Sequence, residues 1–329
     1  MKGTFTIHGF HEAVASVSDL DRSIQFFQEV AGWQLKYRGL VAKEFNLLWR
    51  LEPDIQADEA LLGAPDETTG YLRLIQFHHS EQLQIRSNAQ TWDTGGILDF
   101  NIRIADMDEA FRQFQTADWQ GVGDPVKWQF GPYQVKEWLS RGPDSLCLAL
   151  IERITPTLEG WDLSRSFSRI FNSTQTIRDM DRTLDFYTRV LGFQQVMHHS
   201  GSSPEAGPNV LGIPHNLINR TPHDIYILHP QGENIGSIEL IDFPELEGHN
   251  FSHRASPPNL GALALRFPTE GLDSLRQRFI DEQVPFTETK TNVYFPPYGK
   301  AKILAVQAPE GAWLEFFECE SQSSALPDG

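Results

Sequence analysis

The sequence is poor in cysteine, in basic charge and in long apolar runs, and each shortage excludes a class of protein. The two cysteines, Cys147 and Cys319, are too few for the disulfide framework of a small secreted domain. Lysine and arginine number 27 against 44 acidic residues, and the net charge of −17 argues against nucleic acid or an anionic membrane as partner. No apolar run approaches the roughly 18 residues of a membrane-spanning helix. The first residues, MKGTFTIHGF, lack the apolar stretch of a signal peptide, so we expect a cytoplasmic protein.

Signatures of several common catalytic sites are also missing. No glycine-rich phosphate loop precedes a predicted helix, and no G-x-S-x-G nucleophile turn occurs. Neither cysteine lies in an evident electropositive setting that would activate its thiol. Any chemistry must therefore rest on other residues.

What the sequence does contain is an internal repeat. The stretch DLDRSIQFFQEVAG at 19–32 returns about half the chain later as DMDRTLDFYTRVLG at 179–192. Each copy predicts an amphipathic helix with Asp19 or Asp179 as N-cap, and with Gly32 or Gly192 as the left-handed residue that ends it. The apolar faces are Leu20, Ile24, Phe27 and Ala31 in the first copy, and Met180, Leu184, Tyr187 and Leu191 in the second.

The pattern of apolar residues around these helices predicts four β-α-β-β-β units. In the first unit we expect strands at 10–19, 33–39, 42–52 and 71–77, with an acidic loop at 52–70. The second unit begins near residue 96, the third near 169 and the fourth at 261. The fold class is therefore α+β. We expect an N-terminal domain at 1–155 and a C-terminal domain at 166–320, each of two units, with a linker at 156–165 and a disordered tail at 321–329. The sequence leaves open which units pair.

A strand that runs into V-x-D-L-D-R-S, followed by a helix that ends in L-G-F, resembles the vicinal oxygen chelate superfamily. This superfamily includes glyoxalase I, the bleomycin-resistance proteins, methylmalonyl-CoA epimerase and the extradiol ring-cleaving dioxygenases. The resemblance covers about residues 8 to 320 and identifies the chain as a tandem-domain member. It implies that two units pair into a cup, and that the first and last strands of each unit supply ligands for a divalent metal. It says less about function, because one fold hosts many chemistries.

The resemblance also implies which positions hold the ligands. The first-strand ligand stands seven residues before the Asp of the V-x-D pattern, and the last-strand ligand is the Glu of an I-E-L type pattern. The matching residues are Glu12, Gln76, Asp99 and Ala149 in the first half, and Asn172, Glu239, Ala262 and Glu315 in the second. None of the eight is histidine. A ring-cleaving dioxygenase holds iron(II) with two histidines and a carboxylate, so that activity is the weaker alternative.

Two interpretations of these oxygen donors remain. In the first, Asn172, Glu239 and Glu315 hold a divalent metal, with magnesium, manganese or calcium favoured by the all-oxygen set and iron required only for dioxygenase chemistry. A second candidate cup offers Glu12, Gln76 and Asp99 in the same role. In the other interpretation, the carboxylates pair with arginines that face the cup, such as Arg266, and no metal is bound.

The resemblance and the residues together predict a glyoxalase-like enzyme that acts on a small carbonyl or phenolic compound by proton transfer. Glu239 and Glu315, facing one small cavity, would raise each other's proton affinity and serve as acid and base. Tyr298 is either a further acid or a tyrosine packed at a strand turn. The alternative is a metal-free protein that sequesters a small organic molecule, as the bleomycin-resistance relatives do. Either protein is expected to be a monomer or homodimer.

Aromatic residues recur at matching places in the second and fourth units. They pack in the core or sheets, or else line a pocket for a flat apolar or aromatic ligand. These residues are Trp128, Phe130, Tyr133, Tyr294, Phe295 and Tyr298.

Overall fold

The computed structural model describes residues 4–130, 132–159 and 166–320. The predicted tail at 321–329 and most of the predicted linker, 160–165, lie outside the described residues. The helices are α1 Leu20–Glu29, α2 Glu44–Leu48, α3 Met107–Thr116, α4 Met180–Asp185 and α5 Leu272–Asp281. The strands are β1 Thr6–Ile7, β2 Glu12–Ser16, β3 Gln34–Leu40, β4 Ala57–Gly63, β5 Tyr71–Phe77, β6 Asp99–Ile104, β7 Gln120–Gly121, β8 Val126–Phe130, β9 Tyr133–Arg141, β10 Cys147–Thr155, β11 Phe167–Ile177, β12 Gln194–Gly201, β13 His223–His229, β14 Ser237–Asp242, β15 Gly261–Glu270, β16 Phe286–Glu288, β17 Val293–Phe295, β18 Gly299–Gln307 and β19 Trp313–Cys319.

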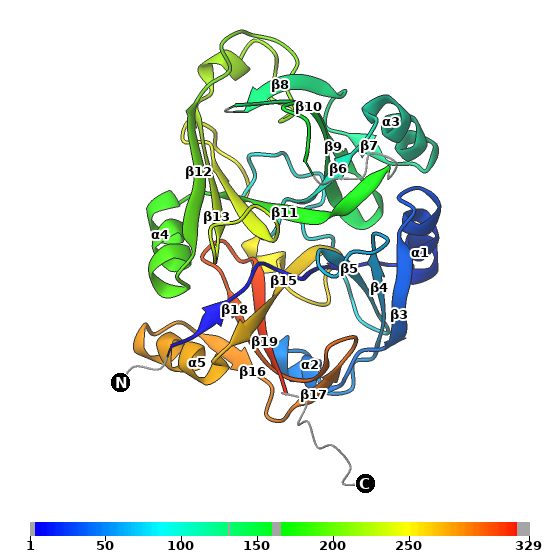
Figure 1. Ribbon diagram of the computed structural model, residues 1–329, viewed down its shortest axis with the longest axis vertical. Helices are drawn as coiled ribbons and strands as arrows, with labels where there is room; N and C mark the ends of the chain where they lie inside the picture. The colour runs from blue at the N-terminus through cyan, green and yellow to red at the C-terminus, as the bar shows by residue number, and fades with distance from the viewer. Residues whose placement is uncertain (1–3, 131, 160–165, 321–329) are drawn as a thin grey trace.

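The strands form two curved mixed sheets, which lie one above the other in Figure 1. One sheet has the order β16-β18-β19-β15-β2-β5-β4-β3 and the other has the order β12-β13-β14-β11-β6-β10-β9-β7. The first sheet therefore joins units one and four, and the second joins units two and three. We call the concave face of the first sheet the first cup and that of the second sheet the second cup. The predicted α+β class with four β-α-β-β-β units is confirmed.

The predicted division of the chain into halves does not coincide with the division into sheets. Residues 1–155 supply half of each sheet, because β2 pairs antiparallel with β15 and β6 pairs antiparallel with β11. The lengths of the connections suit this arrangement. The short segment 156–166 joins two units of the same sheet, whereas the longer segments 78–98 and 243–260 pass from one sheet to the other. A cup of units one and two, or of units three and four, is therefore not formed.

The helix ends follow the predicted chemistry. The side chain of Asp19 accepts a hydrogen bond from the backbone N–H of Arg22 at 3.0 Å, and Asp179 does the same for Arg182. Gly32 and Gly192 adopt φ angles of 67° and 79°, the left-handed conformation expected after a helix. In the second copy α4 continues as a π-helical turn at Phe186–Val190. This turn shifts the buried face, so that Phe186 and Val190 are buried beside Tyr187 and Leu191.

Residues 42–63 differ from the prediction. The segment expected as a strand at 42–52 contains α2, and part of the expected loop is strand β4. The spacing of Phe45, Leu48 and Trp49 is helical, and all three are buried on the first cup. In β4, Ala60 and Leu62 face the helix-side core, whereas Glu59 faces the first cup and pairs with Arg73. The charge of Glu59 made the sequence of this strand look like that of an acidic loop.

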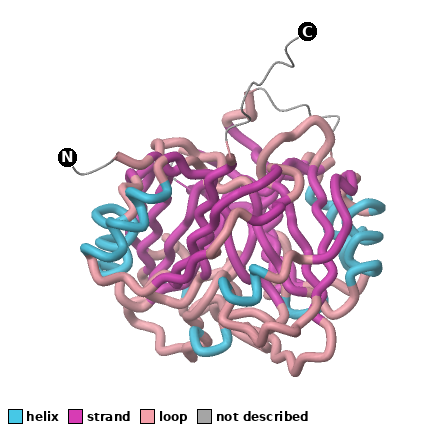
Figure 2. Tube along the Cα trace, turned by 90° about the horizontal axis from the view of Figure 1, so that it is seen from below, coloured by secondary structure: helices cyan, strands magenta, loops and turns pink. Residues whose placement is uncertain are grey.

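The long helices cover the convex faces of the sheets. Figure 2 shows them on two flanks with the strands between them. The main core lies between these helices and the sheets, and it includes Leu20 and Phe27 of α1, Phe114 of α3 and Phe279 of α5. The cups are thus left as separate concave surfaces. None of the helices in the described ranges has the length and apolar character needed to cross a membrane.

Candidate functional site

The first cup is filled by a buried network of three carboxylates and two guanidiniums. Arg73 donates to both oxygens of Glu12 at 2.6 and 2.7 Å, and to Glu59 at 2.9 Å. Arg266 donates to Glu12 at 3.1 Å and to Glu315 at 2.6 Å. Burial alone would raise the pKa of Glu12, but the neighbouring guanidiniums of Arg73 and Arg266 hold this pKa below its usual value. In this cup the carboxylates of Glu12, Glu59 and Glu315 therefore pair with arginines.

Aromatic side chains close the first cup above this network. Trp49, which follows α2, donates its indole N–H to Glu315 at 2.6 Å. The guanidinium of Arg266 lies 4.9 Å from the centre of the Phe45 ring and 5.0 Å from that of Phe295. Figure 1 shows α2 lying within the curve of the lower sheet, close to β17. Apolar packing and ion pairs therefore occupy the space that an open cup would offer to a ligand.

The predicted acid Tyr298 also belongs to this packed region. Its ring packs against Phe295 and Phe317, with ring centres 5.2 and 4.8 Å apart. Burial and the nearby charge of Glu12 raise the pKa of Tyr298 well above its usual value. Its hydroxyl has no hydrogen-bond partner among the described residues. Of the two roles considered for Tyr298, these contacts fit a tyrosine packed at a strand turn better than an acid.

The structure separates several residues that the sequence analysis had grouped. Glu315 lies in the first cup and Glu239 on β14 in the second sheet, so the expectation that these two carboxyls face one cavity is wrong. Gln76 points to the helix side of its sheet, where its side-chain oxygen accepts a hydrogen bond from the backbone N–H of Leu20 at 3.0 Å. The adjacent strand residue, Ile75, packs in the first cup instead.

A bulge changes the faces of two further residues in the first sheet. The register of β15 against β2 shifts between Ala262 and Ala264. Leu263 therefore packs in the first cup and Ala262 in the helix-side core, so Ala262 does not face the cup as its matching ligand position implied. Beyond the bulge, Arg266 faces the cup, as the sequence analysis expected of this arginine.

The second cup is open and holds a cavity of about 170 Å³. A smaller recess of about 40 Å³ adjoins it. Glu137 and Glu239 line both the cavity and the recess, and Asp99 and Thr174 line the recess as well. The cavity walls combine aliphatic and aromatic side chains with a few polar groups. They include Asn101, Arg103, Trp128, Tyr133, Val135, Glu137, Ile151, Arg153, Phe171, Asn172, Val196, Met197, Ile225, Ile227, Asn234 and Glu239. This mixture is typical of a small-molecule site.

Hydrogen-bonded amides and hydroxyls form the polar part of the second cup. Because β6 and β11 pair antiparallel, Asn101 lies opposite Asn172 and donates to its side-chain oxygen at 2.7 Å. Asn101 also donates to Thr174 at 3.0 Å, and Thr174 donates to Glu239 at 3.4 Å. Asn172 in turn donates to Ser237 at 2.7 Å. These bonds fix the orientation of the side chains next to Glu239.

Three carboxyls of the second cup have raised proton affinity. Burial, together with the charges of Asp99 and Glu137, raises the pKa of Glu239 to about 8. Burial also raises the pKa of Glu137 to about 8, although the indole N–H of Trp128 donates to its carboxyl at 2.7 Å and favours the charged form. Burial raises the pKa of Asp99 to about 6, and one of its oxygens has no hydrogen-bond partner among the described residues. These groups can therefore exchange protons near neutral pH.

Two arginines line another part of the same cavity. The guanidinium of Arg103 lies 4.3 Å from the centre of the Phe171 ring, and that of Arg153 lies 4.0 Å from the centre of the Tyr133 ring. Burial and the nearby charge of Arg153 lower the pKa of Arg103 to about 10, and burial also lowers the pKa of Arg153. Both remain charged at neutral pH.

The oxygen donors do not gather into a metal site. No three histidine, cysteine, aspartate or glutamate side chains within the described ranges stand close enough together to hold a metal ion. In the second cup, hydrogen bonds to Asn101 and Ser237 already engage the Asn172 amide. In the first cup, guanidiniums stand between Glu12 and Glu315. The divalent metal implied by the resemblance does not fit these donors, and no step below runs through one.

The sequence analysis missed Glu137, Asn101, Arg103 and Arg153. Strand alternation could have revealed three of them. In DFNIRI, the residues Asp99, Asn101 and Arg103 fall on one face, and in CLALIER Arg153 shares a face with Ala149. Glu137 carried no such signal, because its strand was not assigned to the cup of Glu239.

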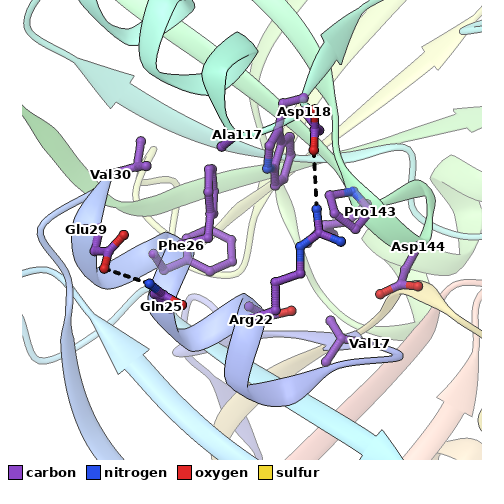
Figure 3. A pocket seen from close by; sticks show the side chains of 14 residues that line it. Val17, Arg22, Gln25, Phe26, Glu29, Val30, Ala117, Asp118, Pro143 and Asp144 are labelled. Carbon is purple, nitrogen blue, oxygen red and sulfur yellow. Dashed lines mark hydrogen bonds and ion pairs between the residues drawn. The ribbon is translucent and has the colours of Figure 1, made fainter.

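A further pocket of about 210 Å³ lies outside the sheets, between α1 and the segment that follows α3 (Figure 3). Phe26 stacks on Trp119 there with ring centres 4.9 Å apart, and exposed Arg22 forms an ion pair with Asp118 at 3.7 Å. Its charged groups face solvent, and none of the predicted site residues lines it. The second cup is therefore the better candidate for chemistry.

Comparisons with known proteins give a family match for residues 169–316 and a fold for nearly the whole chain. Residues 169–316 match the family described as Glyoxalase/Bleomycin resistance protein/Dioxygenase superfamily. Glyoxalase I from Zea mays is similar in structure, with a TM-score of 0.60 and 16% identity, over 95% of this chain and 93% of that one. A putative dioxygenase from Bacillus subtilis gives a TM-score of 0.58 and 14% identity, over 96% of this chain and 86% of that one. Nothing matches among the curated proteins. At these identities the structural matches show the fold alone.

Proposed function

We propose that the protein is an enzyme that moves a proton on a small carbonyl or phenolic compound bound in the second cup. The match of residues 169–316 to the Glyoxalase/Bleomycin resistance protein/Dioxygenase superfamily supports this proposal. The observation that carries this proposal is the pair Glu137 and Glu239, which face one cavity with pKa values of about 8. A carboxyl with such a pKa is close to equally ready to take or give a proton at the pH of the cell.

The chemistry needs one member of the pair charged and the other protonated. The charged carboxylate takes a proton from the carbon next to a carbonyl, and the electron pair of that C–H bond forms the enol double bond. The protonated carboxyl gives its proton to the carbonyl oxygen, so that the enol is neutral. The step involves no oxidation or reduction. Return of a proton to a different face or atom completes an isomerisation. The hydrogen bonds of Asn101 and Thr174 orient the groups around Glu239.

Proton exchange with solvent tests this proposal directly. In D₂O, the protein should speed incorporation of deuterium next to the carbonyl of an enolisable compound such as phenylpyruvate or a related aryl ketone, as followed by NMR. Glu239→Gln and Glu137→Gln should each lower the rate by about 10²-fold or more. Asp242→Asn is the matched control, because Asp242 lies on the same strand with a raised pKa but does not line the cavity. Exchange that is equal in all variants, or absent for every compound that binds, would reject proton transfer.

The dependence of this rate on pH provides a second check. The rate should rise as the pH increases from about 6 towards 8, because the first carboxyl of the pair, with a pKa of about 8, loses its proton and becomes the base. It should fall at higher pH, when the second carboxyl also ionises and no acid remains. A rate that does not change across this range would contradict the assignment.

The aliphatic walls favour one alternative function. Val135, Ile151, Ile225 and Ile227 line the cavity, which suits a protein that binds and sequesters a small organic molecule without changing it. Tight binding without exchange or turnover would support this alternative. The dioxygenase alternative has less support, since no histidine is among the described residues that line the two cavities of the second cup.

A further inference from the structure

We propose that the ligand of the second cup is an aromatic or conjugated carboxylate, with its anionic group held by Arg103 and Arg153 and its other end at Glu137 and Glu239. The role of the two glutamates in this inference rests on the proposed function. The role of the two arginines does not. The inference names the class of compound, which the proposed proton transfer leaves open.

The first argument is that the charges of the two arginines are not balanced. Among the described residues, no carboxylate lies within ion-pair distance of either guanidinium, and the charged or ionisable neighbours of Arg103 are Arg153, Tyr133 and Arg169. The Nε atom of Arg153 is buried without a hydrogen-bond partner in the described part of the chain. Partly buried cations without a counter-ion are costly. They are all the more unusual in a chain with 44 acidic residues and 27 basic ones.

The first cup shows how this chain treats other cup arginines. Arg73 and Arg266 are each bound to two carboxylates, from the set Glu12, Glu59 and Glu315. Outside the cups, half-buried Arg169 forms an ion pair with Glu67. Within the described ranges, the second cup thus differs from the first in having no carboxylate within ion-pair distance of its arginines. An anionic ligand would supply that charge.

The position of the guanidiniums over aromatic rings suits a carboxylate. Each lies over an aromatic ring, Arg103 on Phe171 and Arg153 on Tyr133. A guanidinium that packs its flat face on a ring keeps the N–H groups of its edge available, and this edge matches the two oxygens of a carboxylate. The rings also restrict the arginine side chains before a ligand arrives, which lowers the entropy lost on binding.

The size and walls of the cavity select the rest of the ligand. A cavity of about 170 Å³ is close to the roughly 150 Å³ that holds a benzene molecule. The aromatic side chains Trp128, Tyr133 and Phe171 contribute flat faces to its wall. A compound with one ring or a short conjugated chain fits this space.

The glutamates fix the direction in which such a compound binds. A carboxylate placed near Glu137 and Glu239 would be repelled whenever one of them is charged, whereas a hydroxyl or carbonyl can accept a proton from them or give one to them. The anionic group therefore goes to the arginines, and the group that reacts goes to the glutamates.

Calorimetric titration with matched probes tests the inference. At neutral pH the full chain should bind 4-hydroxybenzoate or phenylpyruvate at least tenfold more tightly than the neutral amide 4-hydroxybenzamide. Arg103→Gln and Arg153→Gln should each weaken binding of the acids by about tenfold or more and leave the amide unchanged. Arg112→Gln, on the exposed face of α3, is the matched control and should change neither. Thermal unfolding checks that each variant is folded. If Arg103→Gln does not fold, the test rests on Arg153→Gln, because Arg153 is less buried than Arg103.

Three results would overturn the inference: equal binding of acid and amide, equal weakening of both by the arginine variants, or no measurable binding of either acid at millimolar concentration. A Glu239→Gln variant separates this outcome from failure of the proposed function. It should keep the preference for the acids over the amide, which rests on the arginines, while losing proton exchange. Arginine-dependent binding without exchange in any variant would reject the enzyme and keep the anionic ligand. Proton exchange without a preference for the acids would keep the enzyme and reject the anionic ligand.

Discussion

At the scale of single residues, the two cups differ in the balance of their charges. In the first cup, two guanidiniums are matched by Glu12, Glu59 and Glu315, and all five groups are almost completely buried. In the second cup, Glu137 and Glu239 stand apart from Arg103 and Arg153, and both pairs face a cavity. A network of matched ion pairs holds its geometry, whereas charged groups without an opposite charge beside them are available to a ligand. This difference in partners distinguishes the structural cup from the proposed functional one.

Removing one member of the buried network should be costly. Arg266→Met leaves Glu12 and Glu315 with less positive charge in a dry environment, so we expect the free energy of unfolding to fall by about 3–5 kcal/mol. Urea unfolding followed by circular dichroism measures this loss. Arg112→Met removes an exposed ion pair with Glu109 and should cost less than about 1 kcal/mol. Similar losses in the two variants would show that the network contributes little.

The carboxyls of the second cup should make the protein less stable as the pH rises. The pKa values of Glu137 and Glu239 are about 8 in the folded chain, above the usual 4.5, so folding favours their protonated forms. Their contribution to stability is therefore fully present below pH 4.5 and is lost as the pH rises to 8 and beyond.

Urea midpoints at about pH 5.5 and about pH 8.5, on either side of most of this titration, measure the effect. Glu137→Gln combined with Glu239→Gln should flatten the decrease, because a neutral amide does not titrate. A decrease that is just as steep in the double variant would place its origin in other groups.

At the scale of elements, α2 decides what happens to the first cup. The helix is short, but it brings Phe45, Leu48 and Trp49 together over the network. The indole of Trp49 adds a hydrogen bond to a charged carboxylate. The aromatic rings of α2 keep water away from the ion pairs, which strengthens the electrostatic attraction between them. The ion pairs in turn provide a partner for the indole of Trp49, so the helix and the network stabilise one another.

Trp49→Phe should reveal the value of that hydrogen bond. The ring remains to fill most of the space, but Glu315 loses a donor, so we expect a loss of about 1.5–3 kcal/mol in the free energy of unfolding. Trp33→Phe is the matched control, since buried Trp33 donates to the neutral backbone oxygen of Ser168 at 3.2 Å. Denaturant unfolding of both variants compares them. A larger loss for Trp33→Phe would contradict the importance of the charged acceptor.

At the scale of the whole molecule, each half of the chain is incomplete. Residues 1–155 contain β2 and β6, whose antiparallel partners β15 and β11 both lie in the other half. Helices α1 and α3 pack within the first half, and Arg189, after α4, forms an ion pair with Glu282, after α5, in the second half. Helix contacts therefore join the units of one half, while strand pairing joins the two halves.

Production of the halves separately should show this dependence. The fragment 1–155 alone should be aggregated or self-associated, because two central strand edges are left unpaired. Produced together, 1–155 and 166–329 should form a soluble complex of one copy each, as measured by size-exclusion chromatography with light scattering. A fragment 1–155 that is monomeric and folded would contradict the observed pairing of units.

The candidate site could be predicted only in part. The positions implied by the family pattern place Asn172 and Glu239 beside a cavity and Glu12 and Glu315 toward a concave face, because the side that a strand residue faces is a local property. Gln76 was misplaced by one residue, and Ala262 by a bulge. Glu137 was missed altogether, because only the neighbouring strands show that it shares a cup with Glu239.

The sequence by itself determined the four β-α-β-β-β units, the capped helices and the faces of most strands, since these depend on residues close together in the chain. The tertiary structure decided which units share a sheet, and hence that Glu239 meets Glu137 instead of Glu315. Backbone hydrogen bonds between strand edges depend little on which side chains the strands carry. The choice of which units pair is therefore made by the lengths of the segments that connect them and by packing across the whole chain.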